Sequence, residues 1–323
     1  MAVAFLTLLP GRTSATADPP SACLDPPHRF ETFSLFAPAL GRSKRILVHL
    51  PPGYDCATAR RYPVFYFNDG HDLFDWNPFA SDLDPALAAE IAKREAWYGS
   101  WHLDDQLDRA IADGRLPPLI AVGIASDDGM RSRDLAPVPW SASVEGRGTR
   151  YGEFVADTVV PAVDARFRTV ADRDCRGIGG ASLGGVSALQ IGLAHPDDFG
   201  LVLSLSPVVR DPAIAAYLAA TWAIGEHVDA PAFLIDFDDD PSGSADLERF
   251  ASGVATAASS GRQATLIQTP GGRHAIASWA KRVVPALVRL FDARCAGQAR
   301  REARSIATIS ERRERPDEGP KGD

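Results

Sequence analysis

The chain has no excess of positive charge. Its 34 lysines and arginines are outnumbered by 42 aspartates and glutamates, so the formal net charge is -8 at pH 7. No cluster of basic residues alternates with aromatic ones, which argues against nucleic acid as a partner. No internal repeat and no cluster of metal ligands stands out either. We therefore expect neither a metal nor a cofactor.

Long apolar runs are also lacking. The first run, residues 2–9, is far shorter than the ~20 residues that a membrane-spanning helix needs. It is followed by Ala15-Thr16-Ala17, an A-x-A pattern suited to signal peptidase, although no positive charge precedes the run. The alternative is an unstructured N-terminal extension. We expect a signal peptide over residues 1–17 and a periplasmic or secreted protein, with the cytoplasm as the alternative.

The most informative feature is a G-x-S-x-G motif formed by Gly180, Ser182 and Gly184. A short apolar segment precedes the motif, and residues 186–194 are typical of a helix packed on that segment. A strand, a sharp turn and a helix are the context of a nucleophile elbow, in which the serine hydroxyl is lifted clear of the sheet. Without these flanks the pattern is more often a glycine-rich turn. The flanks predict Ser182 as a nucleophile.

A serine nucleophile needs a base, which follows it in the chain order of this fold. Three of the seven histidines do so: His195, His227 and His274. His195 closes the helix at the end away from the serine, and His227 lies in a polar loop. His274 lies on a glycine-rich loop after the apolar segment 264–268, and catalytic groups of open α/β sheets gather at the carboxyl ends of strands. His274 is the predicted base, against the alternative of an ordinary surface histidine.

The acid that orients the histidine is expected at the end of the preceding strand. Residues 231–237 are typical of a buried strand, which Asp238, Asp239 and Asp240 follow. Spacing alone does not choose among these aspartates. A calcium-binding loop is excluded, because Pro241 stands where such a loop requires glycine.

Residues 62–75, with the sequence YPVFYFNDGHDLFD, closely resemble the third-strand segment of the putative-esterase family. That family groups enterochelin esterases, feruloyl esterase domains, S-formylglutathione hydrolases and mycolyltransferases. Further similar segments follow in the family's order, at 116–124, 154–168, the elbow, 195–200 and 271–279. The resemblance covers roughly residues 28–293. It implies an α/β-hydrolase fold, with a mostly parallel sheet, helices on both faces and no separate cap domain.

The resemblance also implies roles for three further residues. In relatives the acid closes a Gly-Thr-x-Asp stretch that aligns with residues 237–240, so Asp240 is the predicted acid. Because this chain departs from that stretch at its first two positions, Asp238 stays an alternative. The oxyanion hole of relatives implies the backbone N–H groups of Leu183 and His71. Two preorganised amides of this kind are usually the largest electrostatic contribution to catalysis.

Four cysteines, at positions 23, 56, 175 and 295, fit two disulfides in an oxidising compartment. Four buried thiols in a cytosolic protein are the alternative. In the implied fold the strands that begin near Cys56 and Cys175 are neighbours. We therefore expect a Cys56–Cys175 bridge first and a Cys23–Cys295 bridge second.

The organisation along the chain is α/β throughout. An antiparallel pair is expected at 29–36 and 44–50, with a last helix at about 276–296. Further strands are expected at about 62–67, 118–124, 175–180, 200–205, 231–237 and 263–268. The expected divisions are a signal peptide over 1–17, an esterase domain over 18–296 and a charged, disordered tail over 297–323.

These observations together predict a serine carboxylic ester hydrolase that forms an acyl-enzyme through Ser182, Asp240 and His274. Its partner is expected to be a small-molecule or carbohydrate ester, which the sequence does not identify. One alternative is acyl transfer to a sugar hydroxyl, as the mycolyltransferase relatives suggest. The other is a sugar-binding module without catalysis, against which the intact triad argues.

Overall fold

The computed structural model describes residues 29–74, 99–127, 129–139, 144–209, 211–224, 230–239, 250, 252 and 264–295. The expected signal peptide and charged tail both lie outside these residues.

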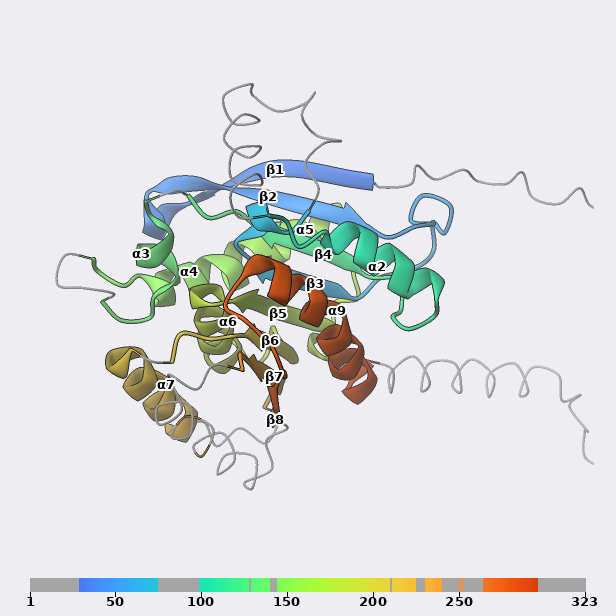
Figure 1. The fold of residues 1–323 in the computed structure, drawn as a ribbon. Helices are drawn as coiled ribbons and strands as arrows, with labels where there is room; N and C mark the ends of the chain where they lie inside the picture. The colour runs from blue at the N-terminus through green and yellow to red at the C-terminus, as the bar shows by residue number, and fades with distance from the viewer. Residues whose placement is uncertain are drawn as a thin grey trace, which may run out of the picture.

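A mixed sheet runs through the described part of the chain (Figure 1). Its order is β1-β2-β4-β3-β5-β6-β7-β8. Only the β1–β2 and β2–β4 pairs are antiparallel, and the other neighbouring strands are parallel. The strands are β1 (Arg29–Ala37), β2 (Arg42–Leu50), β3 (Val64–Asn68), β4 (Ile120–Ile124), β5 (Arg176–Ala181), β6 (Leu201–Leu205), β7 (Ala232–Phe237) and β8 (Ala264–Gln268).

The burial of the strands explains why the sequence predicted them. Every residue of β3 through β7 is buried. Parallel strands that are covered on both faces have this burial, and their sequences are therefore nearly continuous apolar runs. The edge strand β1 instead alternates between exposed and half-buried positions. The expected antiparallel pair and the later strands are confirmed, with boundaries shifted by one or two residues.

Helices cover both faces of the sheet (Figure 1). One face packs against α2 (Leu103–Ala112) and α9 (Ile276–Ala293), and α9 confirms the expected last helix. The other face packs against α4 (Gly148–Phe154), the π-helical η3 (Val155–Val159), α5 (Val160–Arg166), α6 (Leu183–Ala194) and α7 (Pro212–Ile224), with α3 (Arg131–Leu135) beside α4 and α6. In the described ranges, short 3-10 turns occur at η1 (Pro38–Leu40), η2 (Gly70–Asp72) and η4 (Arg173–Cys175). None of the described helices is long and apolar enough to cross a bilayer.

The parallel strands fix where functional groups meet. Strands β3, β5, β6, β7 and β8 run in the same direction, so the segments that follow them emerge at one edge of the sheet. Open α/β sheets bind ligands at this carboxyl edge. The turn η2, the elbow and the loops after β6, β7 and β8 all lie there.

The disulfide prediction was wrong. Cys175 pairs with Cys295, and their Cα atoms lie 4.9 Å apart. Both cysteines are buried in the core that α9 covers, because α9 carries its last residues back towards the start of β5. Cys56 is exposed and follows Tyr54, which packs in the core of the opposite face. Cys56 is itself disulfide-bonded, and Cys23 lies outside the described residues.

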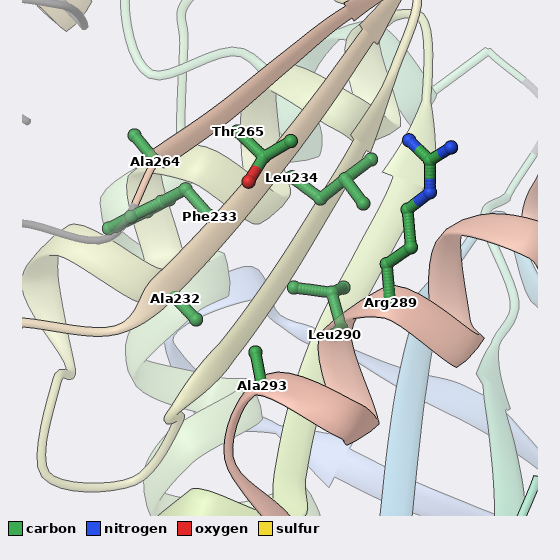
Figure 2. A pocket seen from close by; sticks show the side chains of 8 residues that line it. All are labelled: Ala232, Phe233, Leu234, Ala264, Thr265, Arg289, Leu290 and Ala293. Carbon is green, nitrogen blue, oxygen red and sulfur yellow. The ribbon is translucent and has the colours of Figure 1, made fainter.

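A pocket of about 310 Å³ lies between α9 and the strands β7 and β8, near where these strands begin. Figure 2 shows Leu290 and Ala293 of α9 beside Ala232 and Leu234 of β7, with Arg289 at the margin. Ser182 and His274 are not among the residues that line it. The pocket is therefore separate from the site that follows.

Candidate active site

Ser182 occupies the sharp turn between β5 and α6. Its backbone angles, φ of 57° and ψ of -124°, lie in a region that residues other than glycine rarely adopt. Its amide donates to the Leu205 carbonyl at 2.9 Å, which ties the turn to β6. A Cβ on Gly180 would lie 2.6 Å from the carbonyl carbon of Gly184, so the motif glycines permit the close approach of strand and helix. The turn leaves the serine side chain half-buried at the carboxyl edge.

The loop after β8 brings His274 to this serine. His274 Nε2 lies 2.9 Å from Ser182 Oγ, and His274 Nδ1 lies 3.0 Å from Asp238 Oδ2. A carboxylate only accepts hydrogen bonds, so Nδ1 carries a proton and Nε2 is left to accept the serine proton. The imidazole is about half exposed and meets the Trp279 ring edge-on, with centroids 5.1 Å apart. These contacts join groups from three separate loops.

Asp238, the alternative left open by the sequence, is the observed partner of His274. It directly follows Phe237, the last residue of β7, so the strand fixes where its carboxylate lies. Asp239 instead binds the backbone of the histidine loop, by accepting from the Gly271 amide at 2.9 Å. Asp240 lies outside the described residues. The geometry therefore favours Asp238 over Asp240 for the acid.

The second oxygen of Asp238 is also held. Asp238 Oδ1 accepts from Arg282 Nη2 at 2.9 Å and from the Ser206 hydroxyl. Burial alone would raise the pKa of Asp238, but the hydrogen bonds from His274, Ser206 and Arg282 outweigh it, and the pKa lies below its usual range. The carboxylate is therefore ionised at neutral pH.

The two residues expected to form an oxyanion hole lie in the segments that follow two adjacent strands, β3 and β5. Leu183 is the first residue of α6, and amides of a helix's first turn have no acceptor within the helix. His71 lies in η2, directly after β3, the neighbour of β5. Asn68 links the two segments, because its side-chain amide donates to the Gly184 carbonyl at 2.8 Å. The segments that carry both amides are thus bound to each other beside the serine.

The turn before His71 is clamped by an ion pair that the sequence did not reveal. Asp69 adopts a left-handed conformation, with φ of 58°, and its carboxylate accepts from Arg131 Nε and Nη2, each at 2.7 Å. It also accepts from the Ser126 hydroxyl at 2.7 Å. Burial would raise the pKa of Asp69, but the Arg131 guanidinium outweighs it and lowers the pKa to about 2. Gly70 follows with no room for a side chain, since a Cβ would lie 2.5 Å from the carbonyl carbon of Gly123.

The His71 side chain is engaged with the protein. Its exposed fraction is 8%, and its Nδ1 accepts from the Ser126 amide at 3.3 Å. Its Nε2 lies 3.3 Å from Asp72. These contacts fix the imidazole within the loop and leave the backbone amide as the group relevant to the site.

His195, the other described histidine considered as a base, lies apart from this site. His195 follows the last residue of α6, at the opposite end of the helix from Ser182. His227 lies outside the described residues. Among the residues that the structure describes, no group of three or more His, Cys, Asp or Glu side chains is placed to hold a metal ion.

The contacts of Ser182, His274 and Asp238 can perform nucleophilic chemistry. An imidazole that accepts the hydroxyl proton can return it to a leaving group, and the ionised carboxylate stabilises the imidazolium in between. Arg282, Ser206 and Trp279 around the acid were missed by sequence reasoning. Trp279 stood within a segment similar to the family, but nothing in the sequence assigned it a contact.

Comparison with solved structures identifies the fold. A solved structure titled ferulic acid esterase has a TM-score of 0.60 and 20% identity, with 81% of this chain and 98% of that chain covered. The enterobactin esterase FES from Shigella flexneri, solved in the presence of enterobactin, has a TM-score of 0.62 and 19% identity, with 82% and 59% covered. These similarities show the α/β-hydrolase fold.

A curated relative found by sequence covers a smaller part of the chain. The uncharacterized protein YbbA from Bacillus subtilis (strain 168) is 25% identical over 171 residues, which are 51% of this chain and 56% of YbbA. The chain thus spans little more than half the length of this curated relative. The model of the family described as "Putative esterase" matches residues 37–283, most of the chain. The chain therefore belongs to the family described as putative esterase, as the resemblance in its sequence indicated.

Proposed function

We propose that this protein is a serine carboxylic ester hydrolase in which Ser182 is the nucleophile, His274 the general base and Asp238 the acid. His274 Nε2 takes the Ser182 proton as Oγ forms a bond to the ester carbonyl carbon. The imidazolium then gives that proton to the alkoxide oxygen as the C–O bond breaks, leaving an acyl-enzyme and a free alcohol. Water, deprotonated by the same imidazole, releases the acid and restores the serine.

The amides of Leu183 and His71 are proposed to donate to the carbonyl oxygen when it carries negative charge. Their segments are tied together through Asn68, so the two donors are fixed before the substrate arrives. Donors that need no rearrangement are the most effective ones, and the loss of one costs about 10²–10³ in kcat in a well-studied protease.

The observation that carries this proposal is the continuous chain of contacts from Ser182 through His274 to Asp238. The distances of 2.9 and 3.0 Å are those of hydrogen bonds, and they lie within the range required of a nucleophile and its base. The strained conformation of Ser182 supports the same role, because strain of this kind clusters at active sites.

The test is hydrolysis of a p-nitrophenyl ester by Ser182→Ala. Triad variants of serine hydrolases lose about 10⁴–10⁶ in kcat, so the activity should fall to near background. The matched control is Ser43→Ala, an exposed serine on β2, which should retain the activity. Hydrolysis by Ser182→Ala at a rate close to that of the control would contradict the proposal.

The substrate is addressed by a panel of esters. Two similar structures are those of a ferulic acid esterase and an enterobactin esterase. The panel therefore contains feruloyl esters and siderophore esters beside short acyl and acetyl-sugar esters. Adding a free sugar to each reaction separates hydrolysis from acyl transfer. Free acid as the product supports the proposal, whereas an acylated sugar in its place would indicate the transferase alternative.

We further propose that the protein is exported. The Cys175–Cys295 disulfide supports an oxidising compartment, since structural disulfides are rare in the cytosol. Intact-mass measurement of material purified from its natural host tests this proposal. Cleavage after Ala17 together with oxidised cysteines would support export, whereas a full-length chain with four free thiols would place the protein in the cytoplasm.

A further inference from the structure

Ser206, directly after β6, lies at the centre of a buried polar network behind the acid. Its φ of 46° is in the left-handed region, and its amide is held by the Asp236 carbonyl. Its hydroxyl oxygen lies 2.9 Å from Trp279 Nε1 and 2.8 Å from Arg282 Nη2, and it also contacts Asp238 Oδ1. A serine with three polar partners and 3% exposure is fully engaged.

The chemistry of these partners fixes the direction of every hydrogen bond. The indole N–H and the guanidinium can only donate, and an ionised carboxylate can only accept. Ser206 therefore accepts from Trp279 and Arg282, and its single proton points to Asp238. This proton and the N–H of Arg282 both reach Oδ1, so Oδ2 is left to His274.

Arg282 also binds the surrounding backbone and a second acid. Its side chain is 6% exposed, and Nη1 donates to Asp236 Oδ1 at 3.1 Å. Nη2 lies 3.3 Å from the carbonyl of Arg273, the residue before the catalytic histidine. One guanidinium from α9 thus contacts groups from the loops after β6, β7 and β8.

We propose that Arg282 is a positioning residue for the triad, which holds Asp238 in register with His274. The proposal rests on the proposed function, since it assigns Asp238 and His274 as acid and base. Ser206 transmits part of the effect by giving its proton to the same carboxylate oxygen. Trp279 completes the arrangement, because it binds Ser206 and packs against the imidazole.

The charges around the acid set the sign of the effect. Two carboxylates, Asp236 and Asp238, share the Arg282 guanidinium, and His274 faces Asp238 from the other side. Without the guanidinium, the negative charges of Asp236 and Asp238 next to His274 would lose the positive charge that offsets them. The pair would then bind a proton at higher pH, whichever of its two members takes it.

The test compares Arg282→Met, Arg282→Lys and Arg289→Met in p-nitrophenyl ester hydrolysis. For Arg282→Met we expect kcat to fall roughly 10- to 100-fold, since a misplacement of about 1 Å can cost 10²-fold, with KM nearly unchanged. The acidic limb of its kcat/KM profile should move to higher pH. Arg282→Lys keeps a charge but loses the forked geometry, so it should restore the position of the limb and only part of kcat.

Arg289→Met makes the same substitution on an exposed residue of the same helix and should change neither quantity. If Arg282→Met does not fold, Arg282→Lys and Ser206→Ala carry the test, each with a lower kcat at unchanged KM. A wild-type pH profile and wild-type kcat in folded Arg282 variants would overturn the inference. An inactive wild-type protein would instead overturn the proposed function, so the two failures are distinguishable.

Discussion

The Arg131 guanidinium donates two hydrogen bonds of 2.7 Å to the carboxylate of Asp69, and Asp69 lies two residues before His71. The Asp69 carboxylate also approaches the elbow, because a Cβ on Gly184 would lie 2.7 Å from Asp69 Oδ2. This ion pair therefore holds the turn before His71, the proposed oxyanion donor, at a point where that turn lies close to the elbow. The sequence showed the Asp-Gly-His turn but not the cation that holds it.

Arg131→Met should lower both stability and activity. Removing Arg131, which is itself partly exposed, leaves the nearly buried Asp69 carboxylate without its cation, which should cost roughly 1–3 kcal/mol of the free energy of unfolding. The turn that carries His71 would shift, so kcat should fall while the covalent reactivity of Ser182 persists. Urea unfolding and ester kinetics measure the two effects. Arg133→Met, on the same short helix, is the control, and equal behaviour of the two variants would contradict the account.

The Asp69 ion pair also predicts a dependence of stability on pH. The folded pKa of Asp69 is about 2, below the ordinary value of 3.8. A carboxylate whose pKa is lower in the folded state stabilises the fold, and this stabilisation is complete when the pH is above the pKa of the unfolded state. It is lost as the pH falls from about 4 to about 2. It amounts to roughly 2 kcal/mol. The difference in free energy of unfolding between wild type and Asp69→Asn should narrow in that window, and a constant difference would contradict the assignment.

Asp238→Asn should be far more damaging than Asp240→Asn. An asparagine at position 238 can present N–H groups to the imidazole, which favours the wrong tautomer and costs about 10⁴-fold in kcat in a comparable triad. Asp240→Asn serves as the matched control, and we expect kcat close to that of the wild type. Steady-state kinetics of both variants decide the question. The reverse ranking would return the acid to Asp240.

The Cys175–Cys295 disulfide should stabilise the fold without affecting the chemistry. The two cysteines are 120 residues apart, and closing a loop of that length is worth about 4–5 kcal/mol in the chain-entropy model. Cys175→Ser should therefore lower the thermal midpoint strongly, with kcat unchanged at a temperature where the variant is folded. Thermal unfolding with and without reductant measures this. An unchanged midpoint in the variant would show that the bridge contributes little.

The strands and two of the proposed triad residues were predictable because each leaves a local pattern. Fully buried parallel strands appear in the sequence as uninterrupted apolar runs. Ser182 is recognisable from the glycines that its tight turn requires. His274 followed from chain order and from its place after the last strand. These features depend on residues close together in the sequence.

The remaining features depend on packing between distant segments. The choice between Asp238 and Asp240 depends on how β7 ends against the histidine loop, which spacing does not encode. Arg282 reaches Asp238 across 44 positions, and α9 decides that contact. The disulfide was mispredicted because the starts of neighbouring strands were considered without α9, whose return brings Cys295 beside Cys175.

The most direct measurement of the central claim is mass spectrometry of the protein quenched in acid during turnover of a p-nitrophenyl ester. The account predicts an adduct with the mass of the acyl group on the peptide that contains Ser182, and its absence in Ser182→Ala. In His274→Ala the adduct should form far more slowly. An acyl group on any other residue, or rapid turnover by Ser182→Ala, would contradict the proposal that Ser182 is the nucleophile.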